Sequence, residues 1–280
     1  MPPIALDQEY IKKLIKISKN AGDAIMDIYE SEFDVNFKSD QSPLTKADIV
    51  SNKIISDSLY KLNPKIPILS EESSHISFNE RSSWDEYWLI DPLDGTKEFI
   101  NKNGEFTTNI ALIKKNKPIF GIIHAPCINE TYWGGQSLGC YFLKDDSYSD
   151  IKKINVSPNV NQKITMVSSR SHPSDNLKYI LEMIGEHKIL SIGSSLKFCL
   201  IAKGEADCYL RLGPTSEWDT AAGDAIVRAA RGSIKAINGS EIKYNESDSI
   251  LNPNFIAAAN EELVIKILNI IKTNKINYDR

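Results

Sequence analysis

The chain's most informative stretch reads Trp88-Leu89-Ile90-Asp91-Pro92-Leu93-Asp94-Gly95-Thr96-Lys97. Its apolar and aromatic start predicts the end of a buried strand. Because Pro92 has no backbone N–H and disfavours helix at the preceding residue, we expect the chain to turn there. The turn can aim the carboxylates of Asp91 and Asp94 at one point, with the Leu93 carbonyl between them. Carboxylate and carbonyl oxygens are the ligands that Mg²⁺ prefers.

Gly95 and Thr96 continue this stretch toward a phosphate site. Gly95 lets the backbone approach an anion closely, and Thr96 adds a hydroxyl. Carboxylates, a cation and exposed amide nitrogens together indicate metal-assisted attack on a phosphate. The alternative is an ordinary acidic turn, because Asp-Pro and Asp-Gly are common turn dipeptides.

Two further acidic positions favour the metal site. Glu71 follows a predicted short strand and could add a third carboxylate, although Glu71-Glu72 also fits a solvated acidic pair. Asp219 lies in Glu217-Trp218-Asp219-Thr220-Ala221-Ala222-Gly223-Asp224, directly before an alanine-rich predicted helix. An N-cap role there is favourable. It is compatible with metal ligation, because the two carboxylate oxygens can serve different partners.

Three polar segments lie at predicted helix starts or strand ends. Thr45-Lys46-Ala47-Asp48 fits a capping box, and a functional alternative has Asp48 orienting the Thr96 hydroxyl or the attacking water. Gly193-Ser194-Ser195-Leu196-Lys197 follows a predicted strand and opens a helix, so it offers amide nitrogens and a lysine to an anion. Ser168-Ser169-Arg170-Ser171-His172 is a second loop of this kind. Two such loops would suit a substrate that carries two phosphates.

The composition is that of a globular protein, with 280 residues, 41% hydrophobic, 25% charged and a formal net charge of −4. The small acidic charge argues against a basic nucleic-acid binder. The four cysteines form no CxxC pair and the four histidines are scattered, so we expect buried thiols and no zinc site. We find no signal peptide and no apolar run long enough to span a bilayer. We therefore expect a cytoplasmic protein, with peripheral contact to the inner face of the cell membrane left open.

Apolar spacing predicts an α/β (α+β) chain. Helices are expected over residues 6–30, 45–62, 220–230 and 261–272, and strands over 66–69, 87–90, 106–113, 119–124, 164–168, 189–192, 206–212 and 255–259. Asn238-Gly239 predicts a hairpin turn. We expect a single catalytic domain with two lobes, a metal-binding α+β lobe over residues 1–150 and an α/β substrate lobe over 151–280.

With these segments assembled, the sequence resembles the lithium-sensitive, magnesium-dependent phosphatases. This superfamily includes inositol monophosphatase, fructose-1,6-bisphosphatase and the 3′(2′),5′-bisphosphate nucleotidases. Its two signatures are matched by residues 88–96 and 218–223. Within the superfamily, the sequence is most similar to the bacterial nucleotidases of the CysQ type. Asn103-Gly104-Glu105-Phe106-Thr107 carries this similarity, as does Lys97-Glu98, where the inositol branch usually has Thr-Asn.

The resemblance implies a layered αβαβα fold and hydrolysis of adenosine 3′,5′-bisphosphate to AMP and phosphate. It also implies action on the sulfated form of that nucleotide and a place in sulfur assimilation. Two to three Mg²⁺ ions would be bound by Glu71, Asp91, the Leu93 carbonyl, Asp94 and Asp219. The implied catalytic residues, which serve water activation and proton transfer, are Asp48, Glu71 and Thr96. The implied substrate-binding residues are Asp94, Gly95, Thr96, Ser169, His172, Gly193, Ser194, Lys197 and Asp219.

Two rival functions stay open at this point. Another substrate of the same superfamily, such as inositol 1-phosphate or a sugar bisphosphate, would use the same chemistry with different second-half loops. A catalytically silent nucleotide-binding regulator would keep the fold, but the intact carboxylates argue against it. The sequence does not specify the oligomeric state; a monomer is slightly favoured because monomers are usual in the nucleotidase branch.

Overall fold

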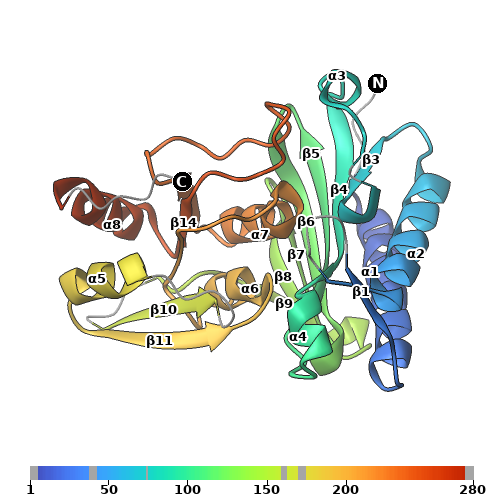
Figure 1. The fold of residues 1–280 in the computed structure, drawn as a ribbon, viewed down its shortest axis with the longest axis horizontal. Coiled ribbons are helices and arrows are strands. Elements are labelled where there is room, and N and C mark those ends of the chain that lie inside the picture. Colours follow the sequence, from blue (N-terminus) through green and yellow to red (C-terminus); the bar gives the residue numbers. More distant parts are fainter. Residues whose placement is uncertain (1–5, 38–42, 74, 159–162, 170–174, 275–280) are drawn as a thin grey trace.

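The computed structural model describes residues 6–37, 43–73, 75–158, 163–169 and 175–274. Helix, sheet, helix, sheet and helix follow one another as layers (Figure 1). A seven-stranded sheet forms from the first half of the chain and a five-stranded sheet from the second half. This arrangement confirms the predicted αβαβα sandwich.

The seven-stranded sheet carries Asp91 and Asp94. Its strand order is β3-β4-β5-β6-β7-β8-β9. β3 pairs parallel with β4, and the other neighbours pair antiparallel. The strands are β3 (Ile68–Ser70), β4 (Glu86–Asp94), β5 (Thr107–Lys114), β6 (Lys117–Ala125), β7 (Glu130–Gly135), β8 (Gly139–Lys144) and β9 (Lys152–Ile154).

Two amphipathic helices, α1 (Gln8–Tyr29) and α2 (Lys46–Leu62), cover one face of this sheet (Figure 1). Apolar residues at helical spacing, such as Leu14 and Ile55, pack with Trp88 of β4 in one buried cluster. Both helices lie within two residues of their predicted bounds. Hydrophobic periodicity therefore accounts for the outer layer that supports β4.

The five-stranded sheet has the order β11-β10-β12-β14-β13. Its strands are β10 (Ile164–Ser169), β11 (His187–Ile192), β12 (Cys208–Arg211), β13 (Ser233–Ala236) and β14 (Phe255–Ala258). Two helices lie between the sheets and two cover the outer face (Figure 1). The inner pair is α6 (Leu196–Ala202) and α7 (Glu217–Ala229), and the outer pair is α5 (Asp175–Ile184) and α8 (Glu261–Thr273).

The short elements complete the described chain. They are β1 (Val35–Phe37), β2 (Pro43–Thr45), η1 (Glu71–Ser73), α3 (Phe78–Arg81), α4 (Thr96–Ile100), η2 (Pro126–Ile128) and η3 (Tyr148–Asp150). The predicted hairpin at Asn238-Gly239 is wrong. These residues turn the chain after β13, but its antiparallel partner β14 begins only at Phe255. The Asn238 side chain accepts from the Ser240 amide at 2.9 Å, which closes a local turn without a second strand.

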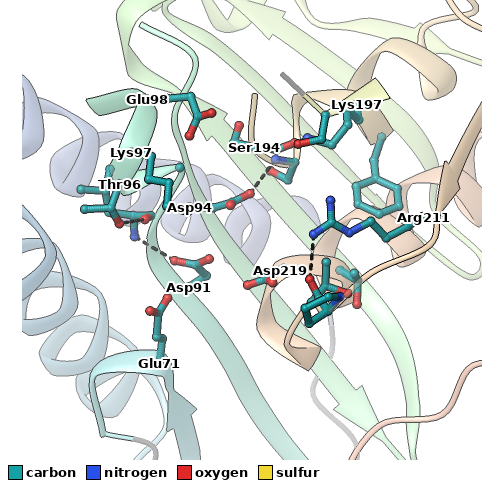
Figure 2. Close-up of a pocket in the computed structure, with 18 of the residues that line it drawn as sticks. Glu71, Asp91, Asp94, Thr96, Lys97, Glu98, Ser194, Lys197, Arg211 and Asp219 are labelled. Atoms are coloured by element: carbon teal, nitrogen blue, oxygen red, sulfur yellow. Dashed lines mark hydrogen bonds between the residues drawn. The ribbon is translucent and has the colours of Figure 1, made fainter. Parts of the chain in front are cut away.

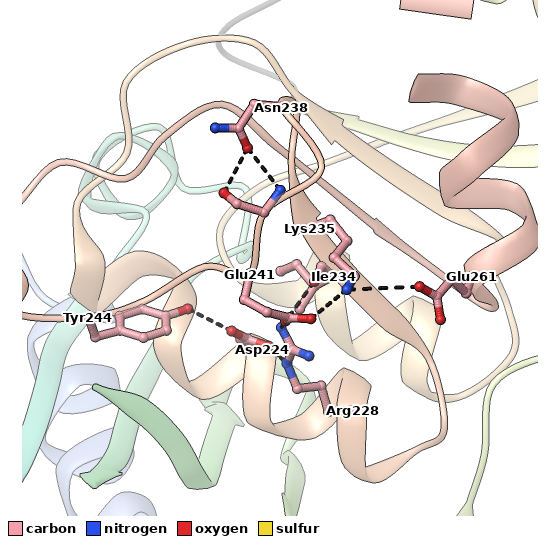
Figure 3. Close-up of polar contacts among 9 residues, drawn as sticks. Asp224, Arg228, Ile234, Lys235, Asn238, Glu241, Tyr244 and Glu261 are labelled. Carbon is pink, nitrogen blue, oxygen red and sulfur yellow. Dashed lines mark hydrogen bonds and ion pairs between the residues drawn. The ribbon is translucent and has the colours of Figure 1, made fainter. Parts of the chain in front are cut away.

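α7 is held along its length. Gly121 of β6 lies so close to this helix that an added Cβ would stand 2.3 Å from the Ala222 carbonyl oxygen. Further along, the buried Asp224 carboxylate pairs with Arg228 and accepts from the Tyr244 hydroxyl at 3.1 Å (Figure 3). These contacts fix the helix whose first turn contains Asp219.

Candidate active site

The end of β4 places Asp91 and Asp94 at one edge of the seven-stranded sheet. The predicted turn at Pro92 is instead an irregular strand end: β4 runs on to Asp94, and its register with β5 shifts between the two aspartates. Proline is tolerated at such a bulge, because one residue there has no ladder partner. The Leu93 amide donates to Asp91 Oδ1 at 3.0 Å.

Glu71 and Asp219 join these aspartates around one open cavity of about 310 Å³. Glu71 begins η1 directly after β3, whose parallel pairing with β4 brings the two strand ends together. Asp219 lies in the first turn of α7. Figure 2 shows the four carboxylates turned toward a shared space. Segments from both halves of the chain therefore build the acidic side of the cavity.

Asp94 and Asp219 are also oriented by backbone amides. Ser195 N donates to Asp94 Oδ2 at 2.5 Å, and Asn109 Nδ2 lies 3.4 Å from the same oxygen. Ser216 N donates to Asp219 Oδ2 at 2.8 Å as part of a capping box. A carboxylate has acceptor capacity on both oxygens. Each aspartate can therefore offer its other oxygen to a ligand in the cavity.

The carboxylates of the acidic cluster are buried or half-buried, and Glu71, Asp91, Asp94 and Asp219 lie close enough to affect one another's charge. Burial raises the pKa of Asp91 well above its usual range, and Glu71, Asp94 and Asp219 raise it further. Burial raises the pKa of Asp219 in the same way, with Asp94 and Glu71 adding to the effect. Burial also raises the pKa of Asp94, while the Lys197 cation opposes that rise. A bound cation would relieve this repulsion.

The donor set fits Mg²⁺, because the four carboxylates and Leu93 supply only hard oxygen ligands around one cavity. Across the residues that the structure describes, no three His, Cys, Asp or Glu side chains already converge into a metal cage. Mg²⁺ does not need one, since it usually keeps several waters and is bound through one or two carboxylates. The metal-ligand assignment is thus compatible with the geometry and stays a prediction.

Asp48 lies directly behind Thr96. Thr96 Oγ1 is 3.2 Å from Asp48 Oδ1 and 3.3 Å from the Leu93 carbonyl oxygen, and can donate to either. Asp48 Oδ2 accepts from the amide and the hydroxyl of Thr45, each at 2.7 Å, and so completes the capping box of α2. Burial raises the pKa of Asp48. Capping and contact with Thr96 therefore use different oxygens of one carboxylate.

Two amides of the Gly193–Ser195 loop, which the sequence analysis assigned to an anion, donate to carboxylates of the protein instead. Gly193 N donates to Glu105 Oε2 at 2.7 Å. Ser195 N donates to Asp94, as described above. Both amides are therefore used within the protein.

Lys197 is buried beneath the same loop. Its Nζ donates to the carbonyl oxygens of Ile192, at 3.3 Å, and Ser194. Burial lowers the pKa of Lys197 to about 8, an effect that Asp94 opposes. The lysine thus supports the loop and adds positive charge at the cavity wall.

Most of the predicted substrate-binding residues lie at the cavity. Those that line it are Asp94, Gly95, Thr96, Ser169, Ser194, Lys197 and Asp219. Gly193 is not part of the lining, and His172 lies outside the described residues. Their contacts with a substrate stay predictions.

The sequence profile of the inositol monophosphatase family matches residues 6–273. The chain belongs to this family. The curated 3′(2′),5′-bisphosphate nucleotidase CysQ of Escherichia coli K12 is 44% identical over 251 residues, which cover 88% of this chain and 98% of that protein. The same-named protein of Buchnera aphidicola is 43% identical over 256 residues, covering 90% and 94%.

Solved structures of the inositol monophosphatase family agree with this assignment. CysQ from Bacteroides thetaiotaomicron matches with a TM-score of 0.78 and 35% identity, covering 90% of this chain and 98% of that one. The IMPase of Thermotoga maritima matches with a TM-score of 0.76 and 24% identity, covering 95% and 99%, and bears on the fold alone. The resemblance found in the sequence is confirmed.

Arg211 also belongs to this site, although no pattern in the sequence pointed to it. This residue ends β12 and lines the cavity near Asp219 (Figure 2). Its Nη2 donates to the Pro214 carbonyl oxygen at 2.7 Å, and its buried Nε has no hydrogen-bond partner among the described residues. The only local signal was a cation at a predicted strand end before Gly213-Pro214-Thr215. We call Arg211 and Lys197, both from the second half of the chain, the cationic side of the cavity; Lys97, next to Thr96, also lines it.

Proposed function

We propose that this chain is a Mg²⁺-dependent 3′(2′),5′-bisphosphate nucleotidase that hydrolyses the 3′-phosphate of adenosine 3′,5′-bisphosphate to AMP and phosphate. Such an enzyme is a phosphoric monoester hydrolase, and the curated CysQ relatives carry the name 3′(2′),5′-bisphosphate nucleotidase. The observation that carries the proposal is an acidic side and a cationic side in one cavity. A substrate with two phosphates would place the reacting one at the acids and the other at the cations.

The acidic side would hold two to three Mg²⁺ ions through Glu71, Asp91, the Leu93 carbonyl, Asp94 and Asp219. When bound, Mg²⁺ would neutralise these carboxylates, activate the attacking water and stabilise the leaving oxygen. Supporting this, the ligands are all oxygens, and burial together with the neighbouring carboxylates raises the pKa values of Asp91 and Asp219.

Thr96 and Asp48 would orient the attacking water and receive its proton. The Thr96 hydroxyl reaches the Asp48 carboxylate at 3.2 Å and lines the cavity, whereas Asp48 lies behind it. Burial raises the pKa of Asp48, which makes it a better proton acceptor than an exposed aspartate. Glu71 would share in activating the water from the neighbouring strand end.

The second phosphate would meet the cationic side. Arg211 presents a planar fork of donors that suits phosphate. Lys197 already donates to two carbonyl oxygens, so it would contribute mainly charge. Ser169 and Ser194 add hydroxyls at the cavity wall. The same arrangement would admit the sulfated form of the nucleotide, which gives the enzyme a place in sulfur assimilation.

The cellular setting of the protein is a further part of the proposal. No helix in the described ranges is long and apolar enough to cross a membrane. The cytoplasmic location and the slight preference for a monomer stay predictions, and peripheral membrane contact finds no support in the comparisons. The division into two lobes also stays a proposal. The last strand of the seven-stranded sheet, β9, ends at Ile154, and the first strand of the five-stranded sheet, β10, begins at Ile164.

Phosphate release tests the proposed function. The rate is measured with adenosine 3′,5′-bisphosphate and, in parallel, with inositol 1-phosphate, each with and without Mg²⁺. We expect Mg²⁺-dependent release from the nucleotide and little from the inositol ester. Asp94→Asn, which keeps the side-chain shape but removes a charge, should lose nearly all turnover with the fold intact.

Other results of the phosphate-release assay would change the proposed function. Preference for the inositol ester would keep the metal site and overturn the substrate assignment. Binding of the nucleotide in Mg²⁺ without phosphate release would establish a silent regulator. Near-normal turnover in Asp94→Asn would refute the metal-ligand role of Asp94.

A further inference from the structure

The Gly193–Ser195 loop packs into a three-way junction with the segments around Gly95 and Glu105. A Cβ added at Gly193 would lie 2.8 Å from the Glu105 carbonyl oxygen and 3.0 Å from Glu105 Cβ. A Cβ added at Gly95 would lie 3.0 Å from that carbonyl oxygen and 3.2 Å from Ser194 Cβ. The two glycines therefore let the loop approach the first half of the chain closely.

The loop is held in a conformation that it would not adopt readily alone. Ser194 has a φ of +46°, in the left-handed region that L side chains rarely occupy. The amides on both sides of it are bound by carboxylates. Gly193 N donates to Glu105 Oε2 at 2.7 Å, and Ser195 N donates to Asp94 Oδ2 at 2.5 Å. The Glu105 and Asp94 carboxylates thus hydrogen-bond to the backbone on either side of Ser194.

We propose that Glu105 is a positioning residue for Asp94. By holding the Gly193 amide, Glu105 keeps the loop in place, and the loop presents the Ser195 amide to Asp94 Oδ2. With Oδ2 fixed, Asp94 keeps one orientation in which Oδ1 can serve a metal ion. This inference rests on the proposed function, because it takes Asp94 as a Mg²⁺ ligand.

Asn109 does not replace this support. Its Nδ2 lies 3.4 Å from Asp94 Oδ2, whereas Ser195 N lies 2.5 Å away. Asn109 Oδ1 itself accepts from the Ser195 hydroxyl at 2.7 Å and from the Thr107 hydroxyl at 3.1 Å, so the loop supplies part of the orientation of Asn109. Partners that orient a metal ligand typically change metal affinity by about 10- to 100-fold. Loss of the Glu105 bond should therefore weaken Mg²⁺ binding measurably.

The test compares Mg²⁺ affinity, measured by titration calorimetry on the full chain, between wild type and Glu105 variants. Glu105→Ala removes the acceptor, and Glu105→Asp keeps the charge but is one methylene too short. Glu105→Gln keeps an acceptor oxygen at the same reach. We expect the Kd for Mg²⁺ to rise about tenfold in the Ala and Asp variants and to stay near wild type in the Gln variant. Glu186→Ala, at an exposed position before β11, is the matched control.

The Mg²⁺ concentration that half-saturates phosphate release should rise in the same order, with a smaller change in kcat at saturating Mg²⁺. Unchanged Mg²⁺ affinity in Glu105→Ala and Glu105→Asp would overturn the proposal. So would a Gln variant as weak as the Ala variant, because charge rather than the hydrogen bond would then be responsible. If the Ala variant does not fold, the Asp and Gln variants decide the matter. A wild type that binds Mg²⁺ but releases no phosphate would refute the proposed function and leave the calorimetric comparison intact.

Discussion

Asp94 Oδ2 accepts a hydrogen bond from the Ser195 amide at 2.5 Å, although the two residues lie 101 positions apart. Asp94 ends β4 of the seven-stranded sheet, and Ser195 is the N-cap residue of α6 in the middle layer. The bond therefore ties the acidic motif of the first half to the second half of the chain. The orientation of the Asp94 carboxylate depends on how the middle layer packs against the first sheet.

Removing Mg²⁺ is expected to destabilise the protein more at pH 8 than at pH 5. Burial and neighbouring carboxylates raise the folded-state pKa values of Asp91 and Asp219. Without metal, the folded state keeps protons that the unfolded chain releases, so the free energy of unfolding falls as the pH rises above the usual aspartate pKa. Mg²⁺ takes the place of those protons, and its stabilising effect grows with pH.

Thermal unfolding at both pH values, in excess Mg²⁺ or in chelator, checks this. At about 100 times the Kd, Mg²⁺ should add about 2.7 kcal/mol at pH 8, or roughly 5–10 °C in Tm. Asp219→Asn should lose most of that gain while its Tm in chelator stays at or above that of wild type. A Mg²⁺ effect of equal size at pH 5 and pH 8 would contradict the raised pKa values.

Local chemistry decides which parts of the site can be predicted from the sequence. The apolar run before Asp91 and the capping pattern around Asp48 depend on residues a few positions apart, and both occur in the structure. Partners from distant segments leave no such signal. Nothing near Ser195 in the sequence indicates that its amide faces Asp94.

Partners from distant segments also decide the residues that would bind the substrate. A helix-opening loop at Gly193 offers amides on local grounds, but tertiary packing brings Glu105 to take one of them. Arg211 has no local feature that separates it from a surface arginine. Only the position of β12, paired with β10 and β14, turns Arg211 into the cavity.

Arg211→Gln should lower kcat/KM for adenosine 3′,5′-bisphosphate by roughly 10- to 100-fold, the size of a lost hydrogen bond to a charged group. The effect on 3′-AMP, which lacks the second phosphate, should be much smaller. Arg211→Lys should be intermediate, since lysine keeps the charge without the planar fork. Comparing kcat/KM on the two substrates is the measurement, with the exposed Arg231→Gln as control. Equal losses on both substrates would show that Arg211 does not bind the 5′-phosphate.

His124→Gln should make the protein less sensitive to acid. His124 is buried in β6 beside Thr131 Oγ1, at 2.9 Å, and burial lowers the pKa of its imidazole to about 3. The unfolded chain binds a proton near the usual histidine pKa, so stability is lost as the pH falls below about 6.5. Between pH 6.5 and 4.5 this group should cost on the order of 2 kcal/mol.

Urea unfolding at pH 7 and pH 4.5 measures that difference. Wild type and His187→Gln, the same exchange at the start of β11, should lose similar stability in acid, and His124→Gln should lose less. Parallel losses in all three proteins would mean that His124 does not stay neutral in the folded state.

Gly121→Ala should damage both stability and catalysis through α7. The added Cβ would lie 2.3 Å from the Ala222 carbonyl oxygen and 2.8 Å from Ala222 Cα, and neither backbone atom can rotate away. The helix must shift, at a cost of about 1–3 kcal/mol, and Asp219 in its first turn must move with it. We expect a lower Tm together with weaker Mg²⁺ binding. Gly213→Ala, where the nearest atoms lie 3.9 Å away, should leave Tm nearly unchanged. A Gly121→Ala protein with reduced Tm but wild-type Mg²⁺ affinity would show that Asp219 is positioned independently of the contact between α7 and β6.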